Sequence, residues 1–214
     1  MGFQDLYVKL IDDIDYDPIV SFIEPHLSKS QTILDAGCGS GVILVPLTLL
    51  GYDILGVDIN SKMLSYADQA LKQKNLKSRL YEHDLRTPLA QSFDVILLFN
   101  DVINYFKGVK KVFSVLKNGL NPNGFMLFDF YKESYLNEMD GYIEKDIDPV
   151  PYEWRVTVKK ATLTHNISDE HGQYKVVQYV YPIEYYLNSL EQLGLKITLL
   201  EGPDERKYYV KASL

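Results

Sequence analysis

A glycine-rich turn between a strand pattern and a helix pattern is the feature that most restricts how this chain can fold. Residues 32–36 (Thr-Ile-Leu-Asp-Ala) predict a short apolar strand, and Gly37, Gly39 and Gly41 follow it at alternate positions. Such glycines permit positive φ angles and let a ligand approach the backbone closely. The apolar residues 42–50 predict a helix behind the turn, whose unpaired N–H groups attract a carboxylate or a phosphate. The segment therefore predicts a ligand-binding turn at the carboxyl end of a strand.

Strand and helix patterns alternate from this turn to about residue 130. Asn60 or Ser61 can cap a helix that reaches about residue 74. Further strands are expected at 52–57, 78–82, 93–99 and 125–130, with a helix at 109–116 and a turn at 122–124. Five strand-then-helix units in this part of the chain predict an open α/β sheet with parallel strands.

The pattern changes after the fifth strand. Within residues 152–181, two stretches of alternating residues are joined by 168–172, which predicts an antiparallel hairpin inserted into the α/β pattern. The alternation changes phase in the first stretch, and this slip predicts a bulge near residues 159–160. We expect the inserted region to span about residues 132–181.

A helix and a hairpin are expected to end the chain. Pro182 opens a helix over 183–193, and residues 195–200 and 207–212 predict the last hairpin. The predicted fold class is α/β: a Rossmann-like, doubly wound, mostly parallel seven-stranded sheet with a C-terminal antiparallel hairpin and a small antiparallel insertion after strand five. We expect residues 1–214 to form a single domain.

Composition argues against several classes of function. The 22 basic and 29 acidic residues give a net charge of −7, which argues against broad contact with DNA or RNA. No basic and apolar leader is visible, and no apolar run approaches the ~18 residues of a membrane helix, so neither secretion nor a membrane anchor is expected. The lone Cys38 excludes an internal disulfide and fits a reducing cytoplasm, where we expect the protein.

Two acidic residues follow the next two strands. Asp58 ends the second strand, 17 residues after Gly41, and a carboxylate there can accept hydrogen bonds from two ribose hydroxyls. Asp84 ends the third strand, where it can accept a hydrogen bond from an adenine amino group. The dinucleotide fingerprint G-x-G-x-x-G is not met, because its third glycine would be Val42, and no Gly-Lys-Ser/Thr follows for a P-loop.

Together these motifs resemble those of the class I S-adenosylmethionine-dependent methyltransferases. Residues 33–41 resemble the family's motif for the methionine end of the cofactor, and residues 56–58 resemble its ribose acid. Residues 121–125 resemble the family's turn into strand five and 193–195 its entry into the terminal hairpin, so the resemblance covers nearly the whole chain. It implies S-adenosyl-L-methionine as the cofactor. It places the following residues around that cofactor: Tyr16, Asp35, Gly37, Cys38, Gly39, Asp58, Ile59, Met63, Asp84, Leu85 and Asn100.

The tyrosine-rich insertion resembles a small-molecule branch of this family that includes amino-sugar and glycine N-methyltransferases. Members of this branch often begin with a Tyr-Asp-x-Leu segment whose tyrosine reaches the cofactor. Tyr7 has that place here, with Val8 where Asp is usual, and Tyr16 is a second candidate of the same kind. The alternative is that both tyrosines pack an N-terminal helix on the sheet.

The segment after the fourth strand is expected to face the transferable methyl group, because ligands bind at the carboxyl ends of the strands in an open α/β sheet. It lacks the Asn/Asp-Pro-Pro-Tyr box of methyltransferases that act on nucleobase or glutamine amino groups. Asp101 can orient an ammonium acceptor or accept its proton; a simple helix cap is the competing interpretation. Asn104 and Tyr7 complete the predicted catalytic set. The predicted wall of the acceptor pocket consists of Tyr105, Asp129, Tyr131, Trp154 and Tyr181.

No metal site is expected. The four histidines (His26, His83, His165 and His171) show neither H-x₃-H nor H-E-x-x-H spacing. His165 and His171 flank the turn of the insertion and are expected to be solvated, whereas Cys38 in the glycine turn is expected to be buried and inert.

The expected function is transfer of a methyl group from S-adenosylmethionine to an N or O atom of a small-molecule acceptor. The reaction is an in-line displacement in which the protein mainly aligns the acceptor. The main alternative is a non-catalytic module that binds S-adenosylmethionine or a nucleotide, and an NAD-dependent enzyme is a further one. An enzyme needs an open pocket above the methyl group, whereas a binding module could have that space filled by Tyr7, Trp154 and Tyr181.

Overall fold

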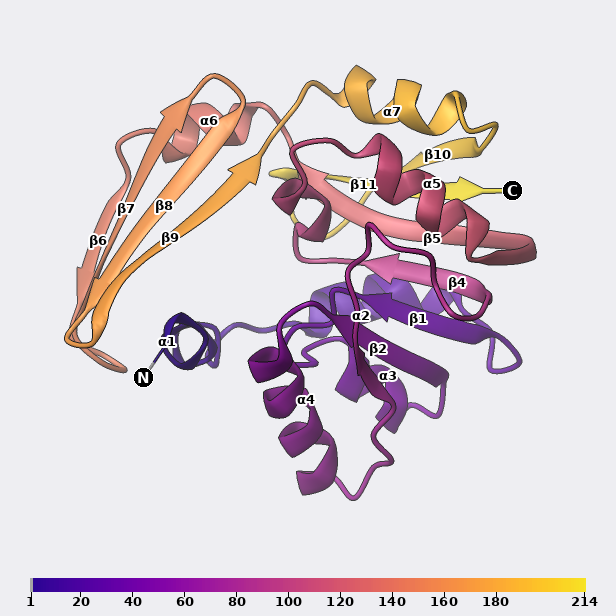
Figure 1. The fold of residues 1–214 in the computed structure, drawn as a ribbon, viewed down its shortest axis with the longest axis horizontal. Coiled ribbons are helices and arrows are strands. Elements are labelled where there is room, and N and C mark those ends of the chain that lie inside the picture. Colours follow the sequence, from indigo (N-terminus) through magenta and orange to yellow (C-terminus); the bar gives the residue numbers. More distant parts are fainter. Residues whose placement is uncertain (1) are drawn as a thin grey trace.

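The structure, a computed structural model, describes residues 2–214 and contains two β-sheets. The larger sheet has seven strands in the order β10-β11-β5-β4-β1-β2-β3 (Figure 1). These strands are β1 (Thr32–Ala36), β2 (Asp53–Asp58), β3 (Leu80–Glu82), β4 (Phe93–Leu98), β5 (Leu120–Tyr131), β10 (Lys196–Leu200) and β11 (Lys207–Ser213). The pairs β1–β2, β1–β4, β2–β3 and β4–β5 are parallel, whereas β11 is antiparallel to β5 and β10. The predicted mostly parallel, Rossmann-like sheet with a C-terminal hairpin is confirmed.

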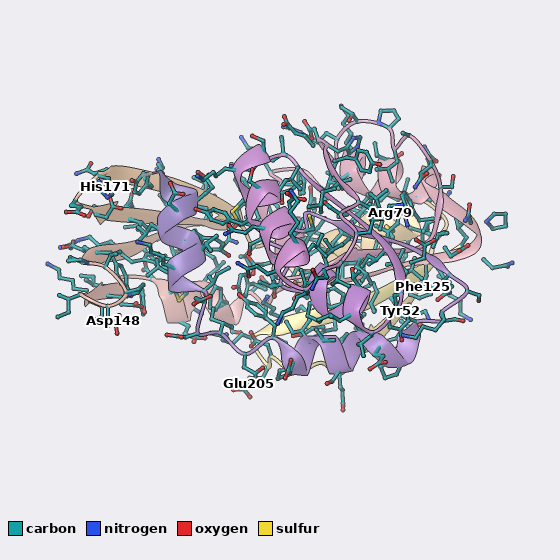
Figure 2. All side chains as sticks on the ribbon, turned by 90° about the horizontal axis from the view of Figure 1, so that it is seen from below. Tyr52, Arg79, Phe125, Asp148, His171 and Glu205 are labelled. Atoms are coloured by element: carbon teal, nitrogen blue, oxygen red, sulfur yellow. The ribbon has the colours of Figure 1, made fainter. Side chains whose placement is uncertain are left out.

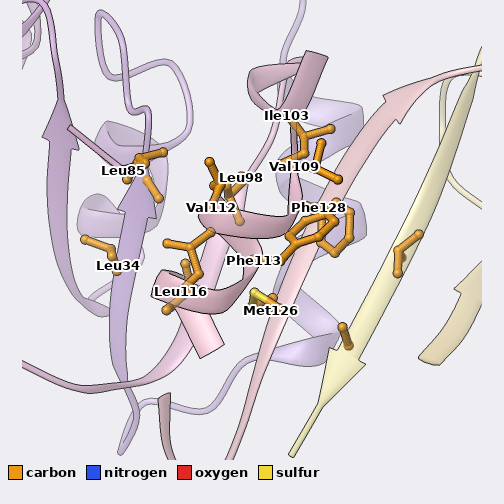
Figure 3. Close-up of a cluster of buried hydrophobic side chains, with 14 of the residues drawn as sticks. Leu34, Leu85, Leu98, Ile103, Val109, Val112, Phe113, Leu116, Met126 and Phe128 are labelled. Atoms are coloured by element: carbon orange, nitrogen blue, oxygen red, sulfur yellow. The ribbon is translucent and has the colours of Figure 1, made fainter. Parts of the chain in front are cut away.

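Helices cover both faces of this sheet. The helices that do so are α2 (Asp17–Ile23), α3 (Leu44–Leu49), α4 (Ser61–Gln73), α5 (Lys110–Asn118) and α7 (Ile183–Glu191). Two other helices, α1 (Phe3–Leu10) and α6 (Ser134–Met139), lie beside the insertion. Successive residues of a strand point to opposite faces, so β1 contributes Leu34 to one buried cluster and Ile33 to the other. Helices α5 and α7 pack on the Leu34 face, where Phe113 contacts Phe128 (Figure 3). Helices α2 and α3 pack on the Ile33 face.

The helix boundaries follow the local signals in the sequence. The side chain of Asn60 accepts hydrogen bonds from the backbone N–H groups of Lys62 and Met63, so Asn60 is the N-cap of α4. Gly51 and Gly194 follow α3 and α7 with positive φ angles, as helix-ending glycines do. No helix within residues 2–214 is long and apolar enough to cross a membrane.

Strand β5 is longer than predicted. Residues 122–124, predicted as a turn before the strand, lie within β5, and Asn123 has a φ of 66°. The pairing of β5 with β4 shifts register between Leu120 and Phe125. The turn signal therefore produces an irregularity inside the ladder, and the chain stays in the sheet.

The insertion is a separate antiparallel sheet of four strands in the order β6-β7-β8-β9. Its strands are β6 (Ile143–Asp146), β7 (Tyr152–Lys159), β8 (Thr162–Asp169) and β9 (Gly172–Tyr179). The bulge predicted near residues 159–160 is wrong. The phase slip marks a tight turn between β7 and β8, where Lys160 has a φ of 55°, so one predicted stretch is in fact two strands. Strand β6, short and largely exposed, carries no apolar alternation from which it could have been predicted.

Helix α1 lies between the tips of the insertion strands and α4 (Figure 1). The Phe3 ring lies 5.7 Å from the Tyr174 ring in β9. On the other side, Asp5 forms an ion pair with Lys62 of α4 at 3.1 Å and accepts a hydrogen bond from the Tyr66 hydroxyl. The helix therefore bridges the insertion and the large sheet.

Candidate active site

Two adjoining cavities lie at the carboxyl ends of the parallel strands. The first has a volume of about 410 Å³ and lies over the glycine turn and Asp58. The second, of about 770 Å³, is lined from the large sheet, from α1 and from the inner face of the insertion. The cavities share the residues Phe3, Tyr7, Ile11, Tyr16, Asn100 and Tyr105. We call the region where the two cavities meet, which these six residues line, the junction.

The glycine turn has the geometry that its sequence predicts. Gly37 and Gly39 have φ angles of 84° and 53°. A Cβ atom on Gly37 would lie 2.8 Å from the side chain of Val102, so only glycine fits there. The N–H groups of Gly37 and Cys38 both donate to the Val57 carbonyl, at 2.7 and 2.9 Å, which ties the turn to β2. The turn therefore presents backbone, and no side-chain bulk, to the first cavity.

Asp58 stands beside the turn at the end of β2. Its Oδ2 accepts a hydrogen bond from the Gly39 N–H at 3.0 Å, and its Oδ1 accepts one from the Asn60 N–H at 2.8 Å. Burial raises the pKa of Asp58, while these N–H donors act in the opposite direction. Each oxygen keeps a second lone pair, so the carboxylate can accept two further hydrogen bonds from a ligand in the first cavity.

Asp35 is a buried carboxyl group that also lines the first cavity. It is 3% exposed, and its Oδ2 has no hydrogen-bond partner among the described residues. Burial and the nearby Asp58 carboxylate raise the pKa of Asp35 to about 7. A buried polar atom without a partner costs free energy, so this oxygen marks a place where a ligand donor would stabilise the protein.

Asp84 and Leu85 line the far end of the first cavity. Both oxygens of Asp84 bind the Arg86 side chain, with Nη2 at 2.7 Å from Oδ2 and Nε at 2.9 Å from Oδ1. These hydrogen bonds lower the pKa of Asp84 to about 2. An adenine amino group at this position would therefore share the carboxylate with Arg86.

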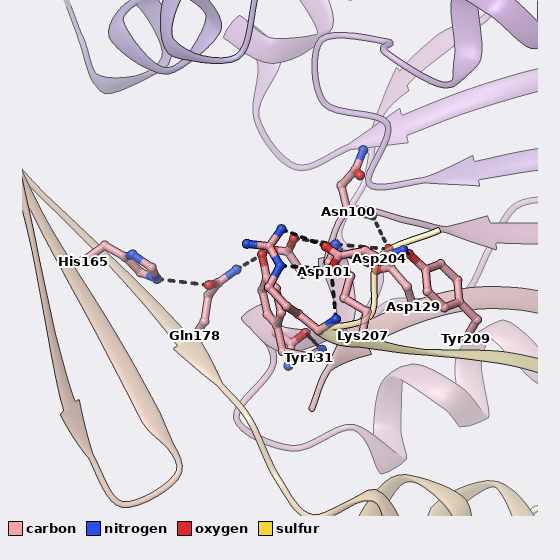
Figure 4. A network of polar contacts seen from close by, with 11 residues as sticks. Asn100, Asp101, Asp129, Tyr131, His165, Gln178, Asp204, Lys207 and Tyr209 are labelled. Carbon is pink, nitrogen blue, oxygen red and sulfur yellow. Dashed lines mark hydrogen bonds and ion pairs between the residues drawn. The ribbon is translucent and has the colours of Figure 1, made fainter. Parts of the chain in front are cut away.

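Asp101 and Lys207 line the floor of the second cavity, and with Asp129 behind them they form a buried charged triad (Figure 4). The Lys207 ammonium of β11 lies 3.2 Å from Oδ1 of Asp101 and 3.2 Å from Oδ2 of Asp129. Burial lowers the pKa of Lys207, but the Asp129 and Asp101 carboxylates outweigh it and hold that pKa above its usual value. Burial raises the pKa of Asp129, and Lys207 opposes this effect. Lys207 therefore remains charged between two carboxyl groups.

Asp129 also fixes the backbone of the segment that carries Asp101. Asn100 and Asp101 both have positive φ angles, 60° and 58°, which are unfavourable for residues other than glycine. Their N–H groups donate to the two oxygens of Asp129, at 3.2 and 2.7 Å. The Asp129 carboxyl group therefore stabilises the strained turn that brings Asp101 to the cavity.

A chain of hydrogen bonds joins Asp101 to the insertion (Figure 4). The Gln178 amide donates to Oδ2 of Asp101, and its oxygen lies 3.1 Å from Nε2 of His165. The Trp154 indole N–H donates to Nδ1 of His165 at 3.1 Å. An indole N–H can only donate, so Nδ1 must accept and the proton of the neutral ring lies on Nε2. Burial lowers the pKa of His165, in agreement with this neutral form.

Comparison with known proteins places this site in a family. Residues 33–124 match a family model described as a methyltransferase domain. The chain is 26% identical to the Bacillus subtilis (strain 168) protein YqeM, which is provisionally named a methyltransferase, over 213 residues that cover 92% of this chain and 86% of that protein.

Solved structures show the same fold. An S-adenosylmethionine-dependent methyltransferase from Clostridium acetobutylicum ATCC 824 matches with a TM-score of 0.84 and 24% identity, covering 99% of this chain and 97% of the other. The amino pentose methyltransferase CalS10 from Micromonospora echinaspora, solved with S-adenosylmethionine bound, matches with a TM-score of 0.74 and 18% identity, covering 100% and 98%.

Residues 33–124 therefore match a methyltransferase domain, and the whole chain has the fold of the S-adenosylmethionine-dependent methyltransferases. The resemblance drawn from residues 33–41 and 56–58 is thereby confirmed for the methyltransferase domain and for the fold. All residues that the sequence places around the cofactor, from Tyr16 to Asn100, line the first cavity of the methyltransferase.

The structure divides the predicted acceptor residues of the methyltransferase into two groups. Asp101, Tyr7, Tyr105, Tyr131 and Trp154 line the second cavity. The remaining three, Asn104, Asp129 and Tyr181, line neither cavity.

These three predictions are corrected as follows. Asn104 is fully buried, and its side chain donates to the Tyr179 carbonyl at 2.8 Å and accepts from the Tyr131 N–H at 3.1 Å, so it joins β9 to β5. Asp129 is fully buried behind the floor, where it supports Asp101. The Tyr181 hydroxyl points away and donates to the Lys107 carbonyl at 2.6 Å.

The prediction that both histidines of the insertion are solvated is half wrong. His165 is 5% exposed and lies on the inner face of β8. His171 lies in the outer turn of the insertion, well away from the large sheet (Figure 2).

Cys38 is buried as predicted, and burial raises the pKa of its thiol. Residues 2–214 contain no group of three His, Cys, Asp or Glu side chains that could hold a metal ion.

Sequence reasoning missed Lys207, Gln178 and the position of His165. The signal was present in the strand parity. Lys207 has the same parity as the buried Tyr209, and Gln178 has the same parity as Val176, which lines the second cavity. A charged or amide side chain on the inner face of a strand is unusual enough to mark a site.

Proposed function

We propose that this enzyme transfers a methyl group from S-adenosylmethionine to an N or O atom of a small-molecule acceptor, with the cofactor in the first cavity and the acceptor in the second. The observation that carries this proposal is the junction. Tyr7, Tyr16 and Asn100 line both cavities, so ligands in the two cavities would meet there. We further propose that residues 1–214 act as one domain, with residues 132–181 as its substrate side.

The first cavity fits the cofactor. The partnerless Oδ2 of Asp35 suits the cationic amino group of a methionine moiety, and the spare lone pairs of Asp58 suit a ribose diol. The bare backbone at Gly37 and Gly39 admits the ligand chain between them. When bound, the cofactor supplies an activated sulfonium methyl group.

Residues of the second cavity would then orient the acceptor and accept its proton. Asp101 lines the second cavity directly after the junction residue Asn100, and Lys207 and Gln178 fix its two oxygens. An ammonium acceptor must lose a proton before its lone pair can attack, and Asp101 can hold that proton. Tyr7 and Tyr16 wall the junction, where phenol rings can stabilise a cation.

Charge favours nitrogen over oxygen as the accepting atom. The buried triad at the floor contains two carboxyl groups, Asp101 and, behind it, Asp129, against one buried ammonium, Lys207. A cationic acceptor compensates the remaining negative charge, whereas a neutral alcohol does not. Amino-sugar methylation by the similar protein CalS10 agrees with this choice.

A non-catalytic binding module is the second candidate, and the second cavity argues against it. Such a module would have Tyr7, Trp154 and Tyr181 filling the space beside the cofactor. Instead Tyr7 and Trp154 line a cavity of about 770 Å³, and Tyr181 is turned away. This volume admits a small molecule.

Two measurements test the proposal. Calorimetry should show binding of S-adenosylhomocysteine and no binding of NAD; the reverse result would refute the cofactor assignment. Incubation with trideuteromethyl-labelled S-adenosylmethionine and a library of amines and alcohols, read by mass spectrometry, should give labelled amines. A library in which no product forms, with cofactor binding intact, would favour the binding module.

A further inference from the structure

We propose that the acceptor carries an apolar body beside its reacting nitrogen, in contrast to the polyhydroxylated body of a sugar. This inference rests on the proposed function and adds the substrate class. It follows from how the polar groups of the second cavity are distributed.

Polar side chains without partners gather at the junction. The structure shows no hydrogen bond, among the described residues, for the phenol groups of Tyr7 and Tyr16 or for the side-chain amide of Asn100. These groups are available to a ligand where the two cavities meet. The polar end of an acceptor therefore belongs at the junction, beside Asp101.

The polar side chains of the insertion wall are engaged with one another. The Trp154 indole donates to His165, and His165 contacts the Gln178 amide. The same amide donates to Asp101, which also binds Lys207. This hydrogen-bond chain uses the indole N–H, both ring nitrogens of His165 and both ends of the Gln178 amide. A hydroxyl group placed against this part of the wall would find only the second N–H and the second lone pair of the Gln178 amide.

Arg206, the remaining cation of this cavity, is engaged as well. Its Nε and Nη2 atoms bind the two oxygens of Asp204, each at 2.9 Å, and its guanidinium lies 5.7 Å from the centre of the Tyr135 ring. Tyr135 in turn stacks on Tyr131 at 3.9 Å. These groups form a packed layer that presents ring surface to the cavity.

The rest of the lining is mostly apolar, and its two further carboxylates, Asp15 and Glu205, belong to exposed residues. Val176 and Ile167 project from neighbouring strands of the insertion, and α1 and the residues after it contribute from the opposite side. The aliphatic side chains from that opposite side are Leu10, Ile11, Ile14 and Ile19. The body of the acceptor would therefore lie between two apolar walls, with its nitrogen at the polar junction.

The physical consequence is a preference between two kinds of amine. A sugar ring in this position would lose water from several hydroxyl groups and gain partners for few of them, and each buried hydroxyl left unpaired lowers affinity by about tenfold or more. A saturated hydrocarbon ring of the same size loses only unfavourable hydration.

A matched pair of probes tests this preference directly. Cyclohexylmethylamine and methyl 6-amino-6-deoxyglucoside both carry an aminomethyl group on a six-membered ring, and they differ in the hydroxyl groups, the ring oxygen and the methoxy group of the sugar. Trp154 is the only tryptophan of the chain and lines the second cavity, so its fluorescence reports binding without turnover. Each probe is titrated into protein saturated with S-adenosylhomocysteine. We expect cyclohexylmethylamine to shift the emission to shorter wavelength and to bind at least tenfold more tightly than the amino sugar. Neutral cyclohexylmethanol should bind more weakly than the amine.

A pair of variants locates the effect. Val176→Thr adds one hydroxyl to the cavity wall with little change in shape, and should weaken cyclohexylmethylamine binding several-fold without weakening amino-sugar binding. Val177→Thr places the same change on the neighbouring residue of β9, outside the cavity lining, and should leave both affinities unchanged. Melting temperatures of both variants show whether they fold as the parent protein does.

Three results would overturn the proposal: tighter binding of the amino sugar, equal binding of the two amines, or no fluorescence response to either amine in protein that binds S-adenosylhomocysteine. Each leaves the proposed function standing, because cofactor binding is measured separately. Failure to bind S-adenosylhomocysteine would instead refute the proposed function on which this inference rests.

Discussion

Replacement of Asp35 by asparagine should stabilise the unliganded enzyme at pH 8 and weaken cofactor binding. Asp35 is 3% exposed, one of its oxygens has no partner among the described residues, and burial together with Asp58 raises its pKa to about 7. In the unfolded chain the group has its ordinary pKa of 3.8. Folding therefore favours the protonated form, and stability falls as the pH rises from 3.8 towards 7.

The size of the effect follows from these two pKa values. A difference of about 3 pH units, at about 1.4 kcal/mol each, makes the ionised Asp35 cost roughly 4 kcal/mol above pH 7. Asparagine removes this cost, but it buries an amide N–H₂ group that lacks partners, at about 1–3 kcal/mol. The net gain at pH 8 is about 1–3 kcal/mol, or a rise in melting temperature of roughly 2–10 °C. Near pH 4 only the amide penalty remains, so the variant should be the less stable protein there.

Thermal unfolding from pH 4 to pH 8.5 and calorimetry with S-adenosylhomocysteine measure both consequences. The control is Asp53→Asn, at the exposed start of β2, where Asp53 pairs with Arg79 on the surface. Its melting temperature at pH 8 should not exceed that of the parent, because it removes only a surface ion pair. Cofactor affinity of Asp35→Asn at pH 8 should fall by about 10–100-fold, the value of a hydrogen bond to a charged group. A difference in melting temperature that does not change sign with pH, or an unchanged affinity, would refute the argument.

Three further predictions concern other parts of the site. Asp58→Ala should weaken S-adenosylhomocysteine binding by a few kcal/mol, through the loss of charge-assisted hydrogen bonds, and equal calorimetric affinities would disprove the assignment. Lys207→Met should lower the free energy of unfolding by about 3–5 kcal/mol in urea at pH 7, because it leaves the buried Asp129 without its cation. A decrease below about 1 kcal/mol would contradict this prediction. Gly37→Ala should abolish cofactor binding in calorimetry and destabilise the fold, because the added Cβ would lie 2.8 Å from the Val102 side chain and the backbone φ is 84°. A variant that binds the cofactor as the parent does would contradict this prediction.

The large sheet could be predicted because its signals are local. The strand of residues 32–36 has the predicted bounds, and Asn60 caps α4 as its sequence position suggests. The two errors have a common cause. The sequence signals at residues 122–124 and 159–160 are both present, but a local signal does not determine the strand pairing around it. At 122–124 the strand continues through the irregularity, whereas at 159–160 the chain turns back and starts a new strand.

The site divides in the same way. The cofactor side depends on residues that follow consecutive strands, such as Asp35 and Asp58, and parallel pairing brings these together automatically. The acceptor side depends on contacts between distant segments. Lys207 and Asp101 are 106 residues apart in the sequence, and Gln178 and Asp101 are 77 residues apart. Contacts between residues so far apart follow no fixed sequence spacing, so no motif predicts them.

This division bears on how the acceptor specificity of such an enzyme can change. The large sheet determines where Asp101 lies, because Asp129 of β5 accepts the N–H groups of the strained turn and Lys207 of β11 holds one carboxylate oxygen. Among the described residues of the insertion, Gln178 is the one that forms a hydrogen bond with Asp101. The insertion otherwise supplies cavity walls such as Trp154 and Val176. Substitutions in those walls therefore change which acceptor body fits while the carboxylate keeps its place. Substitutions of Asp129 or Lys207 would instead move the proton acceptor itself.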